Sequence, residues 1–318
     1  MNASSLNPTL DYYTFDEGSV TKGELPPSSF LKAVEAGMVV ALCISAASTN
    51  LITIASIVSI PRSNHVLDFY ILSLSVANLL VAMAVIPFSL ASKSKIFGYS
   101  SYVLCGLSGY LHVSLSAVYM YTFMWISVDR YLAVLKGLRY ETIQTRTRCK
   151  CWILFTWVMA TFLCSPPLLG DSRRHFYDDS FMCLLNANSM LPYTITLACL
   201  VLMPSIPTLS YTYVCIFTTP ATQATKDDVG HNNSDHISTF IITSIFVLLW
   251  LPWGLLSIVE FSSDKILSGP TLRFWLLFLG QLHTIWTPLV LWSTCGRCRL
   301  GLRAMCRLCF KTGTSVPV

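Results

Sequence analysis

The triplet Asp129-Arg130-Tyr131 is the set of side chains in this 318-residue chain that most clearly could do chemistry, and it closes a long apolar segment. An ionisable residue near the edge of a bilayer is energetically costly and is usually paired. Asp129 is the adjacent partner for Arg130, and a carboxylate–guanidinium pair is a strong, charge-assisted contact. The alternative interpretation of Arg130 is a simple marker of the positively charged membrane side.

Other reactive arrangements are not found in the sequence. No apolar segment carries paired aspartates, a His-Glu-x-x-His motif, or serine and histidine at a usable spacing, so an enzyme is the least favoured class and no cofactor is expected. The net charge of +5 is small and no basic run is interleaved with aromatics, which argues against nucleic acid. Asn78, His112 and His283 are the only candidates for a transport path, and no inverted repeat is visible, so a transporter or channel is a third-ranked class.

Seven apolar segments position these residues. Hydrophobic residues make up 53% of the chain and charged residues 12%, with a mean hydropathy of +0.59, whereas a soluble domain carries about 25% charged residues. A helix of about 20 apolar residues spans the hydrocarbon core of a bilayer. The sequence therefore predicts an all-α membrane protein, a seven-transmembrane helix bundle, with helices near 33–60, 66–92, 102–136, 148–170, 190–217, 236–261 and 270–294.

The distribution of Lys and Arg predicts the orientation, because short cytoplasmic loops are enriched in them. One side of the bundle carries Arg62, Lys136, Arg139, Arg146, Arg148, Lys150, Arg297, Arg299, Arg303, Arg307 and Lys311. That side is expected to be cytoplasmic, with an extracellular tail over 1–32, a membrane domain over 33–294 and a cytoplasmic eighth helix and tail over 295–318. Residues 1–30 lack the apolar core of a signal peptide, so the first helix should act as the membrane signal. The sequon at Asn2 would then be accessible for glycosylation.

The helices carry a series of landmarks in a definite order. These are Asn50, Asn78 within Leu72–Leu80, Cys105, Asp129-Arg130-Tyr131, Trp157, Pro204, Phe246, Trp250-Leu251-Pro252 and Pro288. Each is weak alone, but the ordered set over roughly residues 33–310 resembles the rhodopsin-like (class A) G-protein-coupled receptors. The stretch from Leu249 to Arg303 is most similar to the orphan-type members. The resemblance implies a multi-pass receptor of the plasma membrane, with its N-terminus extracellular and its C-terminus cytoplasmic.

The resemblance also implies partners and roles. A heterotrimeric G protein would bind at the inner face when the 236–261 helix moves outward and Arg130 is released. Buried prolines kink membrane helices, and Pro252, two residues after a tryptophan, resembles the family's hinge. Leu138 matches the loop leucine that inserts into the G protein, although Gly137 replaces the usual proline. The residues assigned to coupling and activation are Asp129, Arg130, Tyr131, Leu138, Phe246, Trp250, Pro252 and Pro288.

The resemblance places a ligand pocket in the outer half of the bundle. The helical aspartate of amine receptors falls on His112, so a simple biogenic amine is disfavoured as the unknown extracellular ligand. Few polar groups and several aromatic ones suit an apolar or modestly polar ligand. His112 could instead be a packed, hydrogen-bonded residue, and the two tryptophans core filler. The matching positions are His112, Val113, Ser116, Thr196, Leu200, Trp250, Trp253, Ser257 and Gln281.

Of the twelve cysteines, only those on the outer side are in a disulfide-permissive environment. Cys105 and Cys183 are the two that fall there, so a bridge is expected between the loop after the 148–170 helix and the start of the 102–136 helix.

Two Cys-x-x-Cys pairs occur in the tail, starting at Cys295 and at Cys306. They raise a zinc site as an alternative, but the gap between them is seven residues, against about 15–20 in zinc ribbons, so no metal is expected. The basic, leucine-containing segment is instead typical of a short amphipathic eighth helix lying on membrane lipid. Cys306 and Cys309 are the predicted palmitoylation sites.

Several departures from the family pattern bear on signalling. Asn78 replaces the aspartate that binds sodium, and Tyr119 and His283 fall where small polar ligands to that ion would sit, so no sodium site is predicted. Its loss could raise basal signalling or freeze the receptor. The family's Asn-Pro-x-x-Tyr motif reads here from Thr287 to Leu291, without the tyrosine. Acidic residues stand where Lys or Arg is common, at Asp227, Asp228 and Asp235.

These departures keep a second hypothesis open. A chain of the same fold could serve as a non-signalling decoy, scaffold or heterodimer partner instead of activating a G protein.

Overall fold

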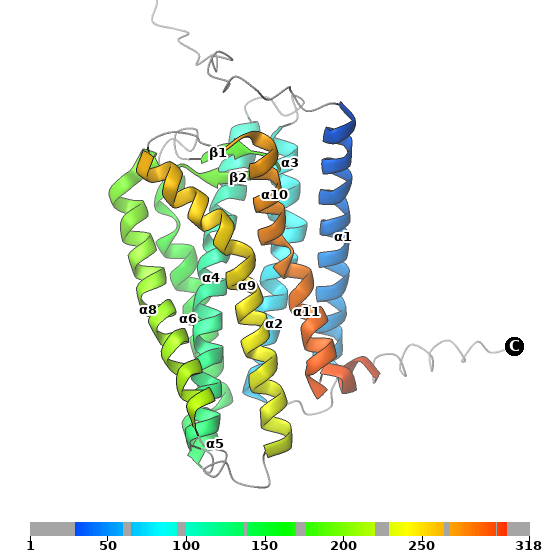
Figure 1. Cartoon of the computed structure of the whole chain (residues 1–318), viewed down its shortest axis with the longest axis vertical. Coiled ribbons are helices and arrows are strands. Elements are labelled where there is room, and N and C mark those ends of the chain that lie inside the picture. The colour runs from blue at the N-terminus through cyan, green and yellow to red at the C-terminus, as the bar shows by residue number, and fades with distance from the viewer. Residues whose placement is uncertain are drawn as a thin grey trace, which may run out of the picture.

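The computed structural model describes residues 29–59, 65–93, 100–136, 139–169, 176–219, 229–263, 268–296 and 298–303. Within these residues, seven helical stretches are long and apolar enough to cross a membrane, and they form one bundle (Figure 1). The seven-helix prediction is confirmed. The stretches are α1 (Ser29–Val58), α2 with η2 and α3 (Val66–Leu80, Val81–Val85, Ile86–Ser92), α4 (Ser100–Lys136), α6 (Arg146–Leu163), α8 (Leu191–Thr218), α9 (Val229–Ser263), and α10 with α11 (Pro270–Gln281, His283–Thr294).

Shorter elements connect these helices at the two ends of the bundle. The end that carries Arg130 also carries α5 (Tyr140–Ile143), and is called here the Arg130 end. The opposite, hairpin end carries β1 (Phe176–Asp179) and β2 (Met182–Leu185), which pair antiparallel with Phe176 opposite Leu185. Two 3-10 turns, η5 (Pro166–Leu168) and η6 (Ala187–Met190), flank this hairpin.

Three of the membrane-crossing stretches contain irregular turns or breaks, and prolines explain the one in the fourth stretch. The fourth stretch ends at Leu163 as an α-helix, because Pro166 and Pro167 cannot donate the next backbone hydrogen bonds and instead open η5. The second stretch contains the π-helical turn η2, which ends directly before Ile86-Pro87. The seventh stretch is interrupted at Leu282, between α10 and α11.

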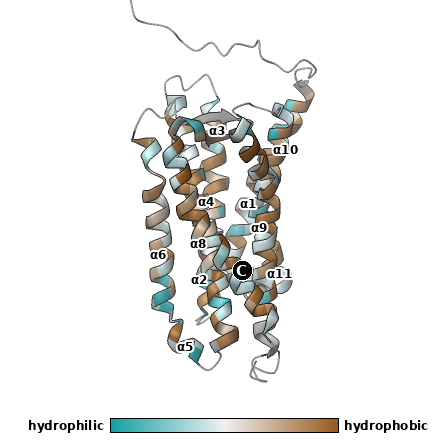
Figure 2. Ribbon diagram, turned by 60° about the vertical axis from the view of Figure 1, so that its left-hand side comes forward, coloured by the Kyte–Doolittle hydropathy of each residue, from teal (hydrophilic) through white to brown (hydrophobic). Residues whose placement is uncertain are grey.

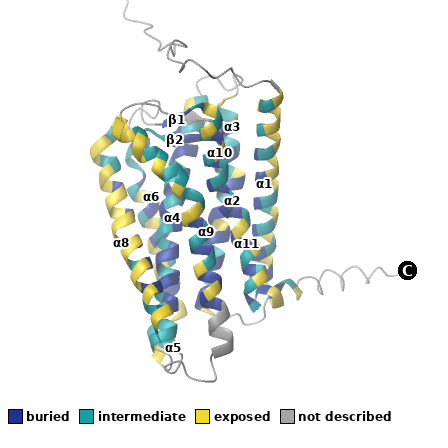
Figure 3. Ribbon diagram, in the orientation of Figure 1, coloured by how far each residue is buried: buried dark blue, intermediate teal, exposed yellow. Residues whose placement is uncertain are grey.

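Burial is uneven around the bundle. Figure 3 shows exposed residues along α8 and buried residues gathered on α2 and α4. The central helix α4 packs against α2, α3, α6, α8, α9 and both strands. Large apolar side chains such as Met203, Val214 and Leu248 are exposed, as lipid contact requires, and Figure 2 shows hydrophobic residues along most of each helix.

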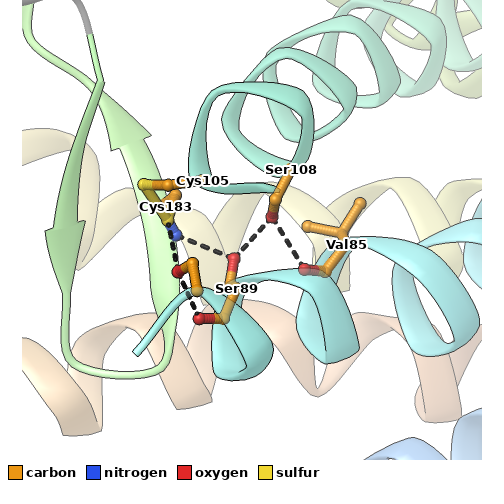
Figure 4. Close-up of a disulfide and its surroundings, with 6 residues drawn as sticks. Val85, Ser89, Cys105, Ser108 and Cys183 are labelled. Carbon is orange, nitrogen blue, oxygen red and sulfur yellow. Dashed lines mark hydrogen bonds between the residues drawn. A yellow bond between two sulfur atoms is a disulfide. The ribbon is translucent and has the colours of Figure 1, made fainter. Parts of the chain in front are cut away.

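A disulfide between Cys105 of α4 and Cys183 of β2 ties the hairpin to the bundle (Figure 4). The backbone N–H of Cys183 donates to Ser89 Oγ at 2.9 Å, and Ser89 contacts the Ser108 hydroxyl. Ser108 Oγ in turn donates to the Val85 carbonyl at 2.7 Å. The expected pairing is confirmed, and the serines continue the connection into α3.

Removing the disulfide should destabilise the folded chain by about 2–4 kcal/mol, because the bridge closes a long loop; its sequence separation is 78 residues. Thermal unfolding in detergent is the measurement, with Cys105→Ala and Cys183→Ala each lowering Tm and the double variant no lower than either. Cys199→Ala, which removes an exposed free thiol, is the matched control. An unchanged Tm in both single variants would show that the bridge contributes nothing.

Candidate functional site

The Arg130 end holds a buried cluster of charges. Asp129 is fully buried and Arg130 is 4% exposed. Arg130 Nε donates to Asp129 Oδ2 at 3.0 Å, and Nη2 contacts the same oxygen. Arg130 Nη1 also lies 3.6 Å from Asp235 Oδ2 at the start of the buried part of α9. The guanidinium therefore connects α4 to α9 across the inside of the bundle.

Tyr140 of α5 completes the cluster. Its hydroxyl donates to Asp129 Oδ1 at 2.8 Å. Burial, together with the Asp129 carboxylate, raises the pKa of Tyr140 above its ordinary value, so the hydroxyl stays protonated and remains a donor. Each oxygen of Asp129 thus has its own partner, which a buried carboxylate needs to be stable.

The Asp129–Arg130 pair was predictable from the sequence, whereas its other two partners, Asp235 and Tyr140, were not predicted. Asp235 was predicted only as an acidic residue where the family commonly carries Lys or Arg. Its position directly before the predicted 236–261 helix was the one feature that could have indicated a buried contact. No pattern in the sequence pointed to Tyr140. Tyr131 lies apart from the ion pair and faces Tyr211 of α8, with ring centroids 6.0 Å apart.

Aromatic rings fill the middle of the bundle. Phe246 packs against Tyr119, Phe123 and His283, with centroid distances of 5.7, 5.0 and 5.1 Å. One turn further along α9, Trp250 lies against Gly280, where an added Cβ would come within 3.0 Å of the indole. Glycine therefore permits the close approach of α10 to Trp250. Pro252 lies inside α9, the helix that carries Phe246 and Trp250, and Pro288 lies inside α11, the helix that carries His283.

His283 provides a polar contact for Trp250 with two competing geometries. Its Nδ1 lies 3.3 Å from Trp250 Nε1 and 2.8 Å from the Gly280 carbonyl oxygen. One ring nitrogen cannot accept from the indole and donate to the carbonyl at once. The tautomer of His283 therefore decides whether Trp250 is hydrogen-bonded to α11.

A network of neutral polar side chains surrounds Asn78. Asn78 Nδ2 donates to Asn50 Oδ1 at 3.0 Å, and the Tyr119 hydroxyl donates to Asn78 Oδ1 at 2.8 Å. Asn50 Nδ2 donates in turn to the carbonyls of Ala46 and Thr284. These amides and the phenol satisfy one another without any carboxylate.

The hairpin end brings some of the expected pocket residues together. His112 lies beside Trp250, with ring centroids 5.8 Å apart. Gln281 Nε2 donates to the sulfur of Met182 at 3.3 Å, and Trp253 carries Arg273 over its ring at 6.0 Å. His112 Nε2 and Gln281 Oε1 are buried and have no hydrogen-bond partner among the described residues.

The remaining expected pocket residues are less central. The hydroxyls of Ser116, Ser257 and Thr196 each donate to a carbonyl of their own helix, and Val113 packs against the core. Thr196 and Leu200 are exposed, so the structure does not bring them to the buried group around His112.

The hairpin itself occupies the outer part of this region, which sequence analysis did not anticipate. Met182 is 0% exposed, and Phe181 packs edge-on against Phe274 of α10 at 5.5 Å. Phe176 lies on Gly109 of α4, where a Cβ would approach its ring to 2.3 Å. Side chains of the hairpin therefore fill space between α4 and α10.

Four of the predicted site residues lie outside the described residues, namely Leu138, Asn2, Cys306 and Cys309, and so do the acidic residues Asp227 and Asp228. In the part of the chain that is described, residues 298–303 are helical beyond α11, and they run across the end of the bundle (Figure 1). Within that same part, no three His, Cys, Asp or Glu side chains are grouped so as to hold a metal ion.

Comparison with known proteins gives a consistent result. A family model described as "7 transmembrane receptor (rhodopsin family)" matches residues 49–291. The chain is 27% identical over 270 residues to G-protein coupled receptor 52 of Mus musculus, covering 77% of this chain and 74% of that protein. It is 25% identical to Probable G-protein coupled receptor 21 of Homo sapiens, with 72% and 71% covered. It is 23% identical to G-protein coupled receptor 161 of Mus musculus, with 91% and 60% covered.

Proposed function

Because this chain belongs to the rhodopsin family of seven-transmembrane receptors, we propose that it is an orphan-type receptor that activates a heterotrimeric G protein. It would lie in the plasma membrane with the hairpin end outside and the Arg130 end in the cytoplasm. The proposal includes glycosylation at Asn2, palmitoylation at Cys306 and Cys309, and contact of Leu138 with the G protein.

The observation that carries this proposal is the buried position of Arg130 between Asp129 and Asp235. A guanidinium enclosed between carboxylates of two helices is unavailable to a partner. Moving α9 away from α4 would separate Asp235 from Arg130 and open a polar cavity at the cytoplasmic face. Pro252 supplies the kink about which the inner part of α9 could swing.

The ligand side of the proposal is an outer group of aromatic and neutral polar side chains. His112 Nε2 and Gln281 Oε1 offer hydrogen-bonding capacity in buried surroundings, which suits a neutral, modestly polar ligand better than a simple amine. Trp250 and Phe246 connect this group to the middle of the bundle. Since Phe181 and Met182 already fill part of the region, basal activity without a ligand is consistent with the proposal.

Replacing Asp235 with asparagine should raise basal nucleotide exchange about three- to fivefold, because it neutralises one partner of the 3.6 Å ion pair with Arg130, an interaction of roughly 1 kcal/mol. The measurement is GTP-analogue binding in membranes from cells that express the chain and a panel of G proteins. Glu141→Gln, which neutralises an exposed carboxylate on α5, should leave exchange unchanged.

A non-signalling receptor homologue is the second candidate, favoured by Leu291 standing where the family carries tyrosine. In that case neither the parent chain nor Asp235→Asn would stimulate exchange on any G protein, although both reach the cell surface.

A further inference from the structure

The two oxygens of Asp235 face two different helices. Oδ2 lies 3.6 Å from Arg130 Nη1 of α4. Oδ1 accepts a hydrogen bond from the thiol of Cys295, at a sulfur–oxygen distance of 3.8 Å. One carboxylate on α9 therefore joins α4 to the end of α11.

The position of Cys295 is set by the corner at which α11 ends. Its backbone N–H donates to the Leu291 carbonyl at 2.9 Å, which closes the last turn of α11. Its own carbonyl accepts from the N–H of Arg299 at 3.2 Å, which begins the next helical segment. These bonds fix the backbone at Cys295, and the residue is only 1% exposed, so its thiol is enclosed by neighbouring groups that include the Asp235 carboxylate.

The family's Asn-Pro-x-x-Tyr motif cannot supply a polar contact at this end of α11, because Leu291 occupies the position of its tyrosine. Leu291 is buried and carries no polar side-chain atom. Cys295 follows it by four residues and so lies on the same face of the helix, one turn nearer the Arg130 end. A thiol is a weak, uncharged donor, so it can orient a carboxylate without neutralising it.

We propose that Cys295 is a positioning residue that orients Asp235 toward Arg130, so that the resting state is a clamp of α4, α9 and α11. The inference rests on the proposed function. It assigns to α11 a direct part in holding α9 closed. Release of α9 then requires the contacts of Asp235 with both Arg130 and Cys295 to break, and displacement of the end of α11 loosens the hold on Arg130.

The test measures the position of α9 without any G protein. Spin-label amino acids, introduced by genetic encoding at exposed Thr147 on α6 and exposed Ile237 on α9, report the α6–α9 distance in purified chain held in lipid nanodiscs. Cys295→Ala should raise the population with the longer distance about threefold, the effect of losing one net hydrogen bond. Cys295→Ser retains a donor and should stay near the parent. Cys164→Ala removes a buried thiol at the other end of the bundle and is the control.

A cavity at position 295 could also disturb packing, so the same substitution is made in an Asp235→Asn background. If the thiol acts through the carboxylate, Cys295→Ala adds no further increase there, whereas a packing effect would persist. Equal distance distributions for Cys295→Ala, Cys164→Ala and the parent would overturn the clamp. If Cys295→Ala lengthens the distance but no variant stimulates nucleotide exchange, the clamp stands and the proposed signalling function fails.

Discussion

Replacing Arg130 with alanine should reduce stimulated nucleotide exchange roughly 30-fold, to the level of membranes without the receptor. An arginine anchor at the centre of an interface typically contributes about 2 kcal/mol or more to binding. In the proposed active state Arg130 leaves Asp235 and faces the G protein, so its removal takes away that anchor. The measurement is the exchange assay described above, on matched amounts of surface protein.

The substitution also changes the folded state, and a second variant separates the two effects. Without Arg130, the fully buried Asp129 loses its ion pair and keeps the hydrogen bond from the Tyr140 hydroxyl. Breaking a buried ion pair by removing one partner costs about 3–5 kcal/mol. The neutral pair Asp129→Asn with Arg130→Gln removes both charges together. It should recover most of the thermal stability and still fail to stimulate exchange.

Two results would count against this account. Exchange that survives in both Arg130→Ala and the neutral pair would mean that the guanidinium is not part of the coupling surface. Exchange restored by the neutral pair would mean that Arg130 matters only for folding. Either result would leave the helix bundle intact and remove the proposed role of its charged end.

The bundle and its disulfide were predictable because their signals are local or follow from topology. Apolar stretches of membrane length specify helices wherever they fall. Cys105 and Cys183 are restricted to each other once the outer side is known. The interruptions of the helices were less predictable. The fourth helix was expected to continue to residue 170 but ends at Leu163, before Pro166 and Pro167, whereas Pro204, Pro252 and Pro288 lie inside continuous helices. The break at Leu282 has no proline and was not expected.

The partners of the buried polar groups were not predictable, because they depend on how helices face one another. Asp235 could be counted as an acidic residue, but its approach to Arg130 and Cys295 depends on the rotation of α9. Tyr140 reaches Asp129 because α5 packs against α4, a placement that the residue pattern does not encode. The burial of Met182 and Phe181 follows from the path of a loop whose sequence has no helical period.

The polar centre of the bundle shows the same division. Sequence analysis identified Asn78 as a departure and inferred the loss of an anionic oxygen. It did not find that Tyr119 and Asn50 close a complete hydrogen-bonded set around that amide. The amide of Asn78 is therefore hydrogen-bonded by its neighbours, and placing the family's aspartate at this one position should lower the stability of the folded chain.

Replacing Asn78 with aspartate should destabilise the folded chain by about 3–5 kcal/mol, the cost of an uncompensated buried charge. The amide N–H that reaches Asn50 Oδ1 would become an oxygen, facing another oxygen about 3.0 Å away. Asn50 cannot relieve the repulsion by rotating its amide, because its Nδ2 already donates to two backbone carbonyls. Thermal unfolding in choline chloride measures the loss.

Asn78→Leu separates charge from lost hydrogen bonding. It leaves Asn50 Oδ1 and the Tyr119 hydroxyl short of a partner, each at about 1–3 kcal/mol, but it introduces no charge. Replacing choline chloride with sodium chloride at equal ionic strength should raise Tm only for Asn78→Asp, because only that variant supplies an anionic oxygen. A sodium-dependent Tm in the parent chain would contradict a neutral network that is complete without a cation, and an Asn78→Asp variant as stable as the parent in choline would contradict the geometry around Asn50.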